Sequence, residues 1–350
     1  MIGILSLGQI LGGSVHGVQA SGEQRLKVSA VSYGNWITHG SQLEAEQAAS
    51  CVRAALDVGI TTFDTADVYA NGRAESILGD ALAGERRDGL EILTKVYFPT
   101  GPGANDTGLS RKHIHEAINA SLRRLKTDYV DVYQAHRYDY ATPLTETMQA
   151  FADVVRAGKA LYIGVSEWTA EQLREAHALA GDLRFSLVSN QPRYNALYRI
   201  IEADVVPTCQ ELGISQVVFS PMEQGILSGK YRPGEPPPQG SRATHASEGA
   251  RFIQRVMRDD VLAGVQQLVP IADAENLTMP QLALAWVLQN DNVASAITGG
   301  SRPEQVTSNA AAADRKLSPE TMAGIDAALH SFIETDGAMV GATTPKRRLR

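Results

Sequence analysis

The sequence predicts an α/β fold in which eight parallel strands alternate with helices and close into a (β/α)8 TIM barrel. From residue 30 onward, short β-branched and aromatic runs alternate with amphipathic helical patterns. A chain of 350 residues that is 43% hydrophobic can bury a core of that size. No G-x-G-x-x-G pattern follows the first run, which argues against the dinucleotide site of an open doubly wound sheet.

The predicted elements follow one another with a regular period. Runs rich in β-branched and aromatic residues predict strands at 30–36, 61–64, 90–96, 129–136, 160–166, 185–191, 216–220 and 294–298. Apolar residues at helical spacing predict helices at 45–56, 75–83, 110–125, 144–157, 169–180, 201–212 and 303–313, with an extra C-terminal helix at 318–329. Gly59 is expected to end the first helix, and Ser110 to cap the third.

Two segments interrupt this rhythm. Residues 232–251 are rich in proline and glycine, and we interpret this long loop as a lid that covers a ligand; a loosely structured surface insertion is the alternative. At the other segment, a Thr-Gly-Gly turn precedes Ser301, Pro303 and Glu304. This pattern predicts a helix capped by Ser301, with a phosphate site at its N-terminus. A capped surface helix without a ligand is the alternative there.

Composition and charge exclude several classes of protein. A formal net charge of −7 argues against a general nucleic-acid-binding protein, and the basic end at 346–350 is expected to be a solvated tail. Cys51 and Cys209 lack disulfide or metal-ligand spacing, so we expect no metal site and a reducing compartment. No run is long and apolar enough to cross a bilayer, and the stretch 1–22 lacks the positive region of a signal peptide. We therefore expect a cytoplasmic protein.

Polar side chains lie at the C-terminal ends of three predicted strands. Asp64 ends the second strand, and Tyr69 lies in the loop after it. Lys95 and His136 lie at the ends of the third and fourth strands. Because these ends meet at one face of a barrel, we expect the four side chains to come together there. Taken singly, each has a structural explanation: a cap, a half-buried tyrosine, a rim ion pair and a hydrogen-bonded core histidine.

Together the four residues form a set that can transfer a proton. A phenol with a pKa of about 10 is a poor acid at neutral pH, and the Lys95 ammonium is expected to lower the pKa of Tyr69. Asp64 can hold Lys95 charged and in place. His136 can hydrogen-bond a carbonyl oxygen, and the set can then deliver a proton to a developing alkoxide.

The segments that carry these residues read Phe63-Asp64-Thr65-Ala66-Asp67-Val68-Tyr69, Thr94-Lys95 and Ala135-His136-Arg137. They resemble the aldo-keto reductase superfamily. Further motifs at 108–114, 158–164 and 228–231 resemble its branch containing the voltage-gated potassium-channel β subunits and their bacterial relatives. The resemblance implies that Asp64, Tyr69, Lys95 and His136 are catalytic, with Tyr69 as the general acid. It also implies one barrel domain at 26–330, an atypical N-terminal segment at 1–25 and a C-terminal tail at 331–350.

The resemblance further implies that NADPH or NADP+ lies across the barrel mouth, where hydride passes from the nicotinamide to a small carbonyl substrate. By matched position, the residues at the nicotinamide end are Gly34, Trp36, Asp64, Ser166, Gln191 and Phe219. The pyrophosphate loop matches Ser220, Pro221, Gly225, Leu227, Gly229 and Lys230. Arg242 and Ser301 are assigned to the 2′-phosphate, and Gln305 and Asn309 to the adenine; Gly299 is a further cofactor-binding residue.

The chain departs from the family pattern at three positions of this site. Glu223 stands in the pyrophosphate loop, where its carboxylate would repel phosphate unless it points away. Glu167 stands where Arg or Asn is often found, and Ser308 stands where a Glu often lies near the adenine. The family also begins with a hairpin at the bottom of the barrel, of which only Leu26-Lys27-Val28-Ser29 is clear.

Three classes of function remain open on these observations. The first is an NADPH-dependent oxidoreductase that reduces small aldehydes or ketones, with Trp36, Tyr69, Tyr97 and Trp168 around an aromatic pocket; packing within loops is the alternative for these aromatics. The second is a redox-sensing regulatory subunit with slow or no turnover. Channel β subunits usually carry Asn in place of His136, so His136 favours the enzyme. The third is a barrel lyase or isomerase without nicotinamide. The branch also suggests a homo-oligomer, a tetramer or larger.

Overall fold

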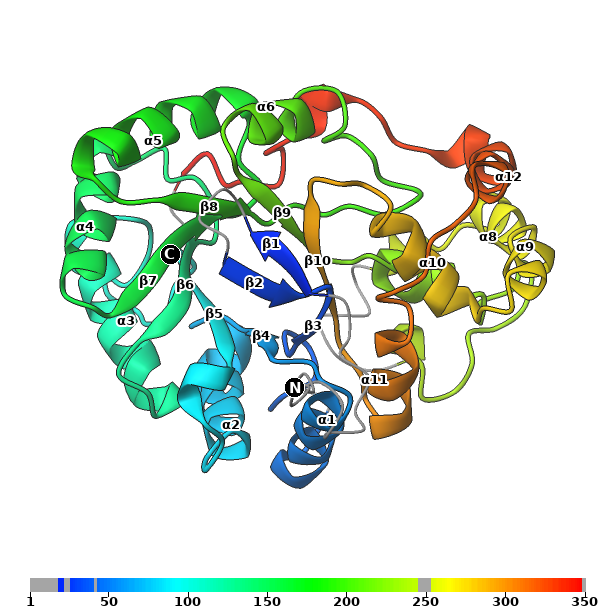
Figure 1. Ribbon diagram of the computed structural model, residues 1–350, viewed down its shortest axis with the longest axis horizontal. Coiled ribbons are helices and arrows are strands. Elements are labelled where there is room, and N and C mark those ends of the chain that lie inside the picture. The colour runs from blue at the N-terminus through cyan, green and yellow to red at the C-terminus, as the bar shows by residue number, and fades with distance from the viewer. Residues whose placement is uncertain (1–17, 22–25, 41–42, 245–252, 348–350) are drawn as a thin grey trace, which may run out of the picture.

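The barrel closes as the sequence predicts. In the computed structural model, which describes residues 18–21, 26–40, 43–244 and 253–347, eight parallel strands form a closed barrel in the order β10-β3-β4-β5-β6-β7-β8-β9 (Figure 1). The strands are β3 (Val31–Gly34), β4 (Thr62–Asp64), β5 (Glu91–Val96), β6 (Val130–Ala135), β7 (Ala160–Val165), β8 (Leu187–Asn190), β9 (Ser215–Val218) and β10 (Val293–Thr298). Helices surround this barrel, so the predicted fold class is confirmed.

The helices largely follow the predicted ones. They are α1 (Ala45–Asp57), α2 (Arg73–Ala81), α3 (Arg111–Leu125), α4 (Leu144–Arg156), α5 (Ala170–Leu183), α6 (Val205–Glu211), α8 (Asp259–Gln266), α9 (Val269–Ala274), α10 (Met279–Val287), α11 (Pro303–Ala310) and α12 (Pro319–Leu329). Ser110 caps α3 as predicted, because its side chain accepts a hydrogen bond from the amide of His113. The helices α8, α9 and α10 are not among the predicted ones.

Two helix predictions are wrong in detail. The helix expected at 201–212 begins only at Val205, because residues 201–204 form turns. Ser301 does not cap α11: the N-cap is Arg302, which makes no side-chain cap bond. Instead, the amide and hydroxyl of Ser301 both donate to Oε1 of Gln305, at 2.9 and 3.1 Å. Ser301 thus bonds Gln305, in the first turn of α11, instead of capping the helix.

The interior of the barrel changes from apolar to polar along the strands. Leu93, Val132, Val188, Val217 and Ile297 form an apolar cluster within the barrel. Two residues further along β5 and β6, on the same face of each strand, stand Lys95 and Gln134, both fully buried. Because side chains alternate between the two faces of a strand, Lys95 and Gln134 lie inside the barrel at its C-terminal end.

A two-stranded hairpin precedes the first strand of the barrel. Strand β1 (Val18–Ser21) pairs antiparallel with β2 (Leu26–Ser29), and this hairpin contacts β9 and β10 (Figure 1). A hairpin is thus present where the family pattern has one, and it includes residues 18–21 of the segment that the resemblance set apart. The remainder of the predicted segment 1–25 lies outside the described residues.

The C-terminal tail packs against loops of the barrel. The amide of Glu334 donates to the Leu197 carbonyl at 2.9 Å, and Lys346 Nζ donates to the Tyr140 hydroxyl at 2.9 Å. Lys346 and Arg347 are exposed, as expected of a solvated basic end; residues 348–350 lie outside the described part.

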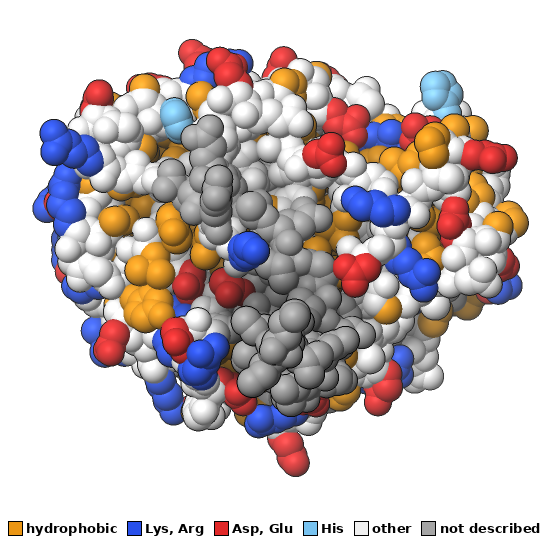
Figure 2. Space-filling view, viewed as in Figure 1, with side chains coloured by type: hydrophobic (Ala, Val, Ile, Leu, Met, Phe, Trp, Pro, Cys, Tyr) orange, Lys and Arg blue, Asp and Glu red, His pale blue; other side chains and the backbone are white. Residues whose placement is uncertain are grey.

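The distribution of charged side chains on the surface agrees with the expectation that the protein is not a general nucleic-acid-binding protein. On the face shown in Figure 2, acidic and basic side chains are interspersed over the described residues, without a continuous basic stripe. Within the described part of the chain, no helix is both long and apolar enough to cross a membrane.

Candidate active site

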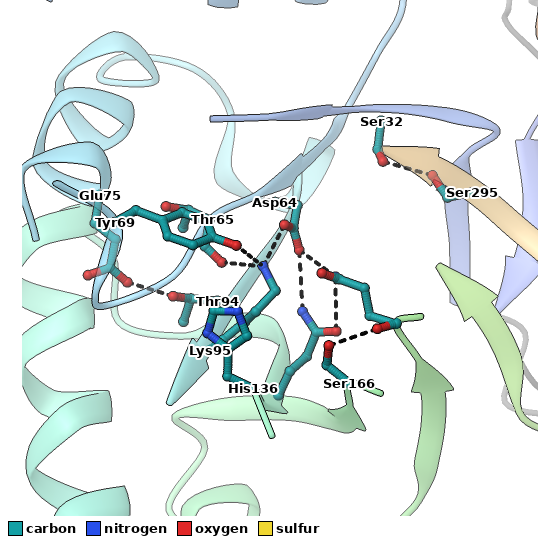
Figure 3. Close-up of polar contacts among 12 residues, drawn as sticks. Ser32, Asp64, Thr65, Tyr69, Glu75, Thr94, Lys95, His136, Ser166 and Ser295 are labelled. Carbon is teal, nitrogen blue, oxygen red and sulfur yellow. Dashed lines mark hydrogen bonds and ion pairs between the residues drawn. The ribbon is translucent and has the colours of Figure 1, made fainter. Parts of the chain in front are cut away.

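The Lys95 ammonium is the centre of the polar site (Figure 3). Lys95 comes from β5 and is fully buried; its Nζ donates to Asp64 Oδ1 at 2.5 Å and to the Thr65 carbonyl at 2.8 Å. A third hydrogen bond, at 3.4 Å, runs from Nζ to the Tyr69 hydroxyl oxygen. The ring of His136 meets that of Tyr69 edge-on, with centroids 5.8 Å apart. The structure thus brings the four predicted side chains together.

Buried amides complete the surroundings of Asp64. Gln191 Nε2 donates to Asp64 Oδ2 at 2.8 Å, and Gln134 Nε2 donates to the same atom at 3.3 Å. Ser166 lies beside Gln191 and donates its hydroxyl to the Gln191 carbonyl at 2.7 Å (Figure 3). Asp64 is therefore fixed by one cation and two amides, so it can hold Lys95 in a single geometry.

Burial sets the protonation states of the site. Burial raises the pKa of Tyr69, and the nearby Lys95 only partly offsets this effect. The expectation that Lys95 gives Tyr69 a lowered pKa is thus wrong, because dehydration of the phenolate outweighs the attraction. Burial alone would lower the pKa of Lys95, but Asp64 and Tyr69 raise it above its ordinary value. Burial, with Lys95 and Arg137, lowers the pKa of His136 well below its usual range, so its imidazole is neutral at pH 7.

The loop that carries Tyr69 has a strained backbone, and hydrogen bonds of the nearby Glu75 hold it in place. Ala70 and Asn71 have positive φ values of 49° and 55°, in the left-handed region that non-glycine residues rarely adopt. Glu75, in α2 just after this loop, is fully buried; it accepts hydrogen bonds from Thr94 Oγ1 at 2.6 Å and from Arg124 Nε at 2.6 Å. Thr94 precedes Lys95 on β5, so this network ties the Tyr69 loop to the strand that carries Lys95.

The aromatic residues divide into two groups. Trp36 lies 6.4 Å from Tyr69, and Phe98 lies 4.8 Å from His136, measured between ring centroids. Tyr97 and Trp168, expected at the pocket, are almost completely buried. Trp168 packs edge-on against Tyr138, with centroids 4.9 Å apart. For these two residues the alternative of packing within loops is correct, and Phe98 lies beside the site without having been predicted.

The loop after β9 has backbone conformations that let a ligand approach its main chain closely. Ser220, Glu223 and Gln224 have φ values between 46° and 56°, and Gly225 has a φ of 102°. Glu223 is buried, and its carboxylate accepts hydrogen bonds from Arg193 Nε, from Arg193 Nη2 and from the Asn195 amide. Its charge is thus directed into an ion pair within the protein, which removes the predicted conflict with a phosphate.

The same loop is joined to the predicted lid. Gln224 Nε2 donates to Ser220 Oγ at 2.6 Å, and Gln224 Oε1 accepts from Arg242 Nη1. Burial lowers the pKa of Arg242 to about 10, so the guanidinium is still charged at pH 7. The lid is described only as far as residue 244; its remainder, 245–251, lies outside the described residues.

The donors around this loop fit a phosphorylated dinucleotide. Among the described residues, no carboxylate forms an ion pair with Arg242 or Lys230. Cations without a counter-ion are suited to binding a phosphate group. Ser301 and Gln305 bond each other at the start of α11, and Asn309 is buried in the same helix. Of the other expected residues, Gly34 pairs with Asp64 across β3 and β4, and Gly299 follows β10.

The two other departures have structural partners of their own. Glu167, with a φ of 60°, accepts from the Arg193 amide at 2.8 Å and from the Thr343 hydroxyl at 2.9 Å. The Ser308 carbonyl accepts from Gln281 Nε2 at 2.9 Å.

Sequence reasoning missed Gln134, Arg193 and Asn195. Gln134 could have been found from its place two residues before His136 on a buried strand. The other two carry no local signal, because their partner Glu223 is distant in the sequence.

Comparison with known proteins agrees with this geometry. The model of the aldo/keto reductase family matches residues 30–330. A probable voltage-gated potassium channel subunit beta of Arabidopsis thaliana is 44% identical over 300 residues, which cover 84% of this chain and 90% of the relative. A putative subunit beta of Schizosaccharomyces pombe is 42% identical over 320 residues (88% and 92%), and a probable one of Oryza sativa subsp. japonica is 41% identical over 318 residues (89% and 95%). The chain therefore belongs to the aldo/keto reductase family, which supports a general role as an oxidoreductase.

Proposed function

We propose that this protein is an NADPH-dependent oxidoreductase that reduces small aldehydes and ketones to alcohols. The observation that carries the proposal is the buried Lys95 ammonium, which bonds both the Asp64 carboxylate and the Tyr69 hydroxyl. An ion pair that served stability alone would not need a phenol as its third member. The position at the C-terminal ends of the strands is also that of barrel active sites.

Tyr69 acts as the general acid in this proposal. Its oxygen accepts a hydrogen bond from Lys95, so its own proton is left to be donated elsewhere. Because burial raises its pKa, the phenol is protonated until charge develops on the substrate oxygen. Lys95 then stabilises the phenolate that forms, and Asp64 holds Lys95. The neutral His136 offers an N–H to the same carbonyl oxygen.

The chain would hold the cofactor along the mouth of the barrel. NADPH, when bound, supplies the hydride for the carbonyl carbon. Ser166 and Gln191 stand next to Asp64 and could hold the carboxamide. Arg242 and Ser301 would meet the 2′-phosphate. Lys230 would lie at the pyrophosphate, which the left-handed residues from Ser220 to Gly225 would let the backbone approach.

The test of the catalytic role is Tyr69→Phe, with Tyr129→Phe as a matched control at the opposite end of β6 from His136. We expect Tyr69→Phe to bind NADPH like the wild type and to lose at least about 100-fold in kcat with a panel of small aldehydes. Removal of the Tyr69 hydroxyl should leave the packing of the Tyr69 ring intact, since only one oxygen atom is lost. Retention of most activity in Tyr69→Phe would refute the acid role.

The test of the cofactor is Arg242→Ala, followed by titration with NADPH and NADH through nicotinamide fluorescence. One charge-assisted hydrogen bond to a phosphate corresponds to about 10- to 100-fold in affinity. We expect NADPH binding to weaken by that factor, while NADH binding changes little. Equal weakening of both would argue against recognition of the 2′-phosphate.

The second candidate is a redox-sensing regulatory subunit with slow or no turnover. The names of the three relatives, which call them channel β subunits, favour it. We also propose a cytoplasmic homo-oligomer, a tetramer or larger, which sedimentation of the purified protein would test. Tight NADPH binding without turnover of any aldehyde would favour the regulatory subunit.

A further inference from the structure

Arg137 takes no part in the proton-transfer set, although it directly follows His136 at the end of β6. Its Nη1 donates to the His136 carbonyl at 2.5 Å and to the Ser166 hydroxyl at 3.2 Å. Its Cζ lies 5.7 Å from the centroid of the Phe98 ring. The guanidinium therefore lies at the catalytic face, in contact with residues that follow β5, β6 and β7.

The charge of Arg137 has no counter-ion. Across the described residues, none of the ion pairs includes it, and its buried Nε has no hydrogen-bond partner. The neighbouring acids are committed elsewhere: Asp64 to Lys95, Asp139 to the Leu109 amide and Thr142, and Glu167 to Arg193 and Thr343.

A partly buried cation without an anion is costly, and a guanidinium is shaped to bind a carboxylate through two parallel hydrogen bonds. An anion from outside the chain would satisfy the charge of this partly exposed guanidinium.

The neighbours of Arg137 indicate the substrate rather than the cofactor as the source of this anion. The cations suited to cofactor phosphates, Lys230 and Arg242, belong to the loop after β9 and to the predicted lid. Arg137 instead adjoins His136 and Phe98, whose rings pack together 4.8 Å apart beside the general acid. Resting on the proposed carbonyl reduction, we propose that Arg137 binds a substrate carboxylate, so that the preferred substrates are short oxo-carboxylates.

The reaction leaves this carboxylate unchanged. The C=O π bond of the substrate breaks, the carbon gains the hydride of NADPH, and the oxygen gains the proton of Tyr69. NADPH is oxidised to NADP+, and the product is a hydroxy-carboxylate. Arg137 is therefore a specificity-determining residue: it sets the distance between the carboxylate that it binds and the carbonyl next to Tyr69 and His136.

The experiment compares two aldehydes that differ in charge and by one methyl group, 4-oxobutanoate and its methyl ester, with NADPH in excess. We expect the wild type to favour the anion at least about 10-fold in kcat/KM, chiefly through KM. Arg137→Gln, which retains donors for Ser166 and His136, should reduce this preference by at least about 10-fold. Arg137→Lys should retain part of the preference, and Arg53→Gln, at an exposed arginine of α1, should leave it unchanged.

The possible failures differ from one another. If the wild type reduces both aldehydes with equal kcat/KM, the carboxylate site is refuted and the proposed reductase stands. If Arg137→Gln weakens NADPH binding and leaves the preference intact, the anion belongs to the cofactor and the inference is overturned. If neither aldehyde nor any other is reduced despite tight NADPH binding, the proposed function fails and the inference falls with it.

Discussion

The pair formed by Glu223 and Arg193 offers the sharpest test of the reasoning about the cofactor loop. Glu223→Gln keeps the volume of the side chain and removes its charge. The Glu223 side chain is 1% exposed and that of Arg193 is 25% exposed, so the variant leaves a partly buried guanidinium without a counter-ion. It also turns an amide toward the donors of Arg193 and Asn195.

The expected cost follows from this burial. Removing one partner of a fully buried ion pair costs about 3–5 kcal/mol in unfolding free energy. Because Arg193 is a quarter exposed and can be hydrated, we expect about 2–3 kcal/mol for Glu223→Gln. The double variant Arg193→Met, Glu223→Gln should be more stable than the sum of the single effects by about 2 kcal/mol, since neither unpaired charge remains.

The assay is urea unfolding of the cofactor-free protein, followed by circular dichroism, for the two single variants and the double one. Asp80→Ala is the control, because the pair of Asp80 with Lys126 is exposed at both ends and should contribute less than about 1 kcal/mol. Two outcomes would refute the claim that the buried ion pair holds Glu223 in this loop. One is that the stability losses of the two single variants simply add up in the double variant; the other is a loss of less than about 0.5 kcal/mol for Glu223→Gln.

Two further predictions concern stability. The pKa of His39 is lowered by burial to about 4 and that of His136 also lies below its usual range, whereas an unfolded histidine titrates near about 6.5. Because the unfolded chain then binds more protons, the unfolding free energy should fall as the pH drops from about 6.5 to about 4; His39→Asn should flatten this slope in urea titrations at each pH, and an unchanged slope would contradict the assignment. Gly79→Ala should destabilise by about 1–3 kcal/mol, because the new Cβ would lie 2.6 Å from the Arg124 carbonyl oxygen of α3, whereas Gly181→Ala in α5 meets nothing within 4 Å and should be neutral or stabilise by up to about 1 kcal/mol in thermal unfolding. Equal melting temperatures for the two variants would show that α2 and α3 are not in such close contact.

The sequence by itself determined the barrel and which four polar side chains meet at the C-terminal ends of its strands. Its alternation of strand and helix patterns has a period that few folds share, and Asp64, Lys95 and His136 each stand at the end of a strand. Ser110 could be predicted as the N-cap of α3, because it accepts its hydrogen bond from the amide of His113, which is near in sequence. Such features depend on residues that are near in sequence, so they can be found before the chain folds.

Only the tertiary structure decided the electrostatics and the pairing of the loops. Burial, which depends on every surrounding element, raises the pKa of Tyr69 against the pull of Lys95. Glu223 is neutralised by Arg193, 30 residues away, and the expected Ser301 cap gives way to Gln305. The unpaired charge of Arg137 is visible only once every nearby carboxylate is seen to be bound elsewhere. Desolvation and long-range ion pairs have no sequence period, because they arise from contacts that closure of the barrel creates.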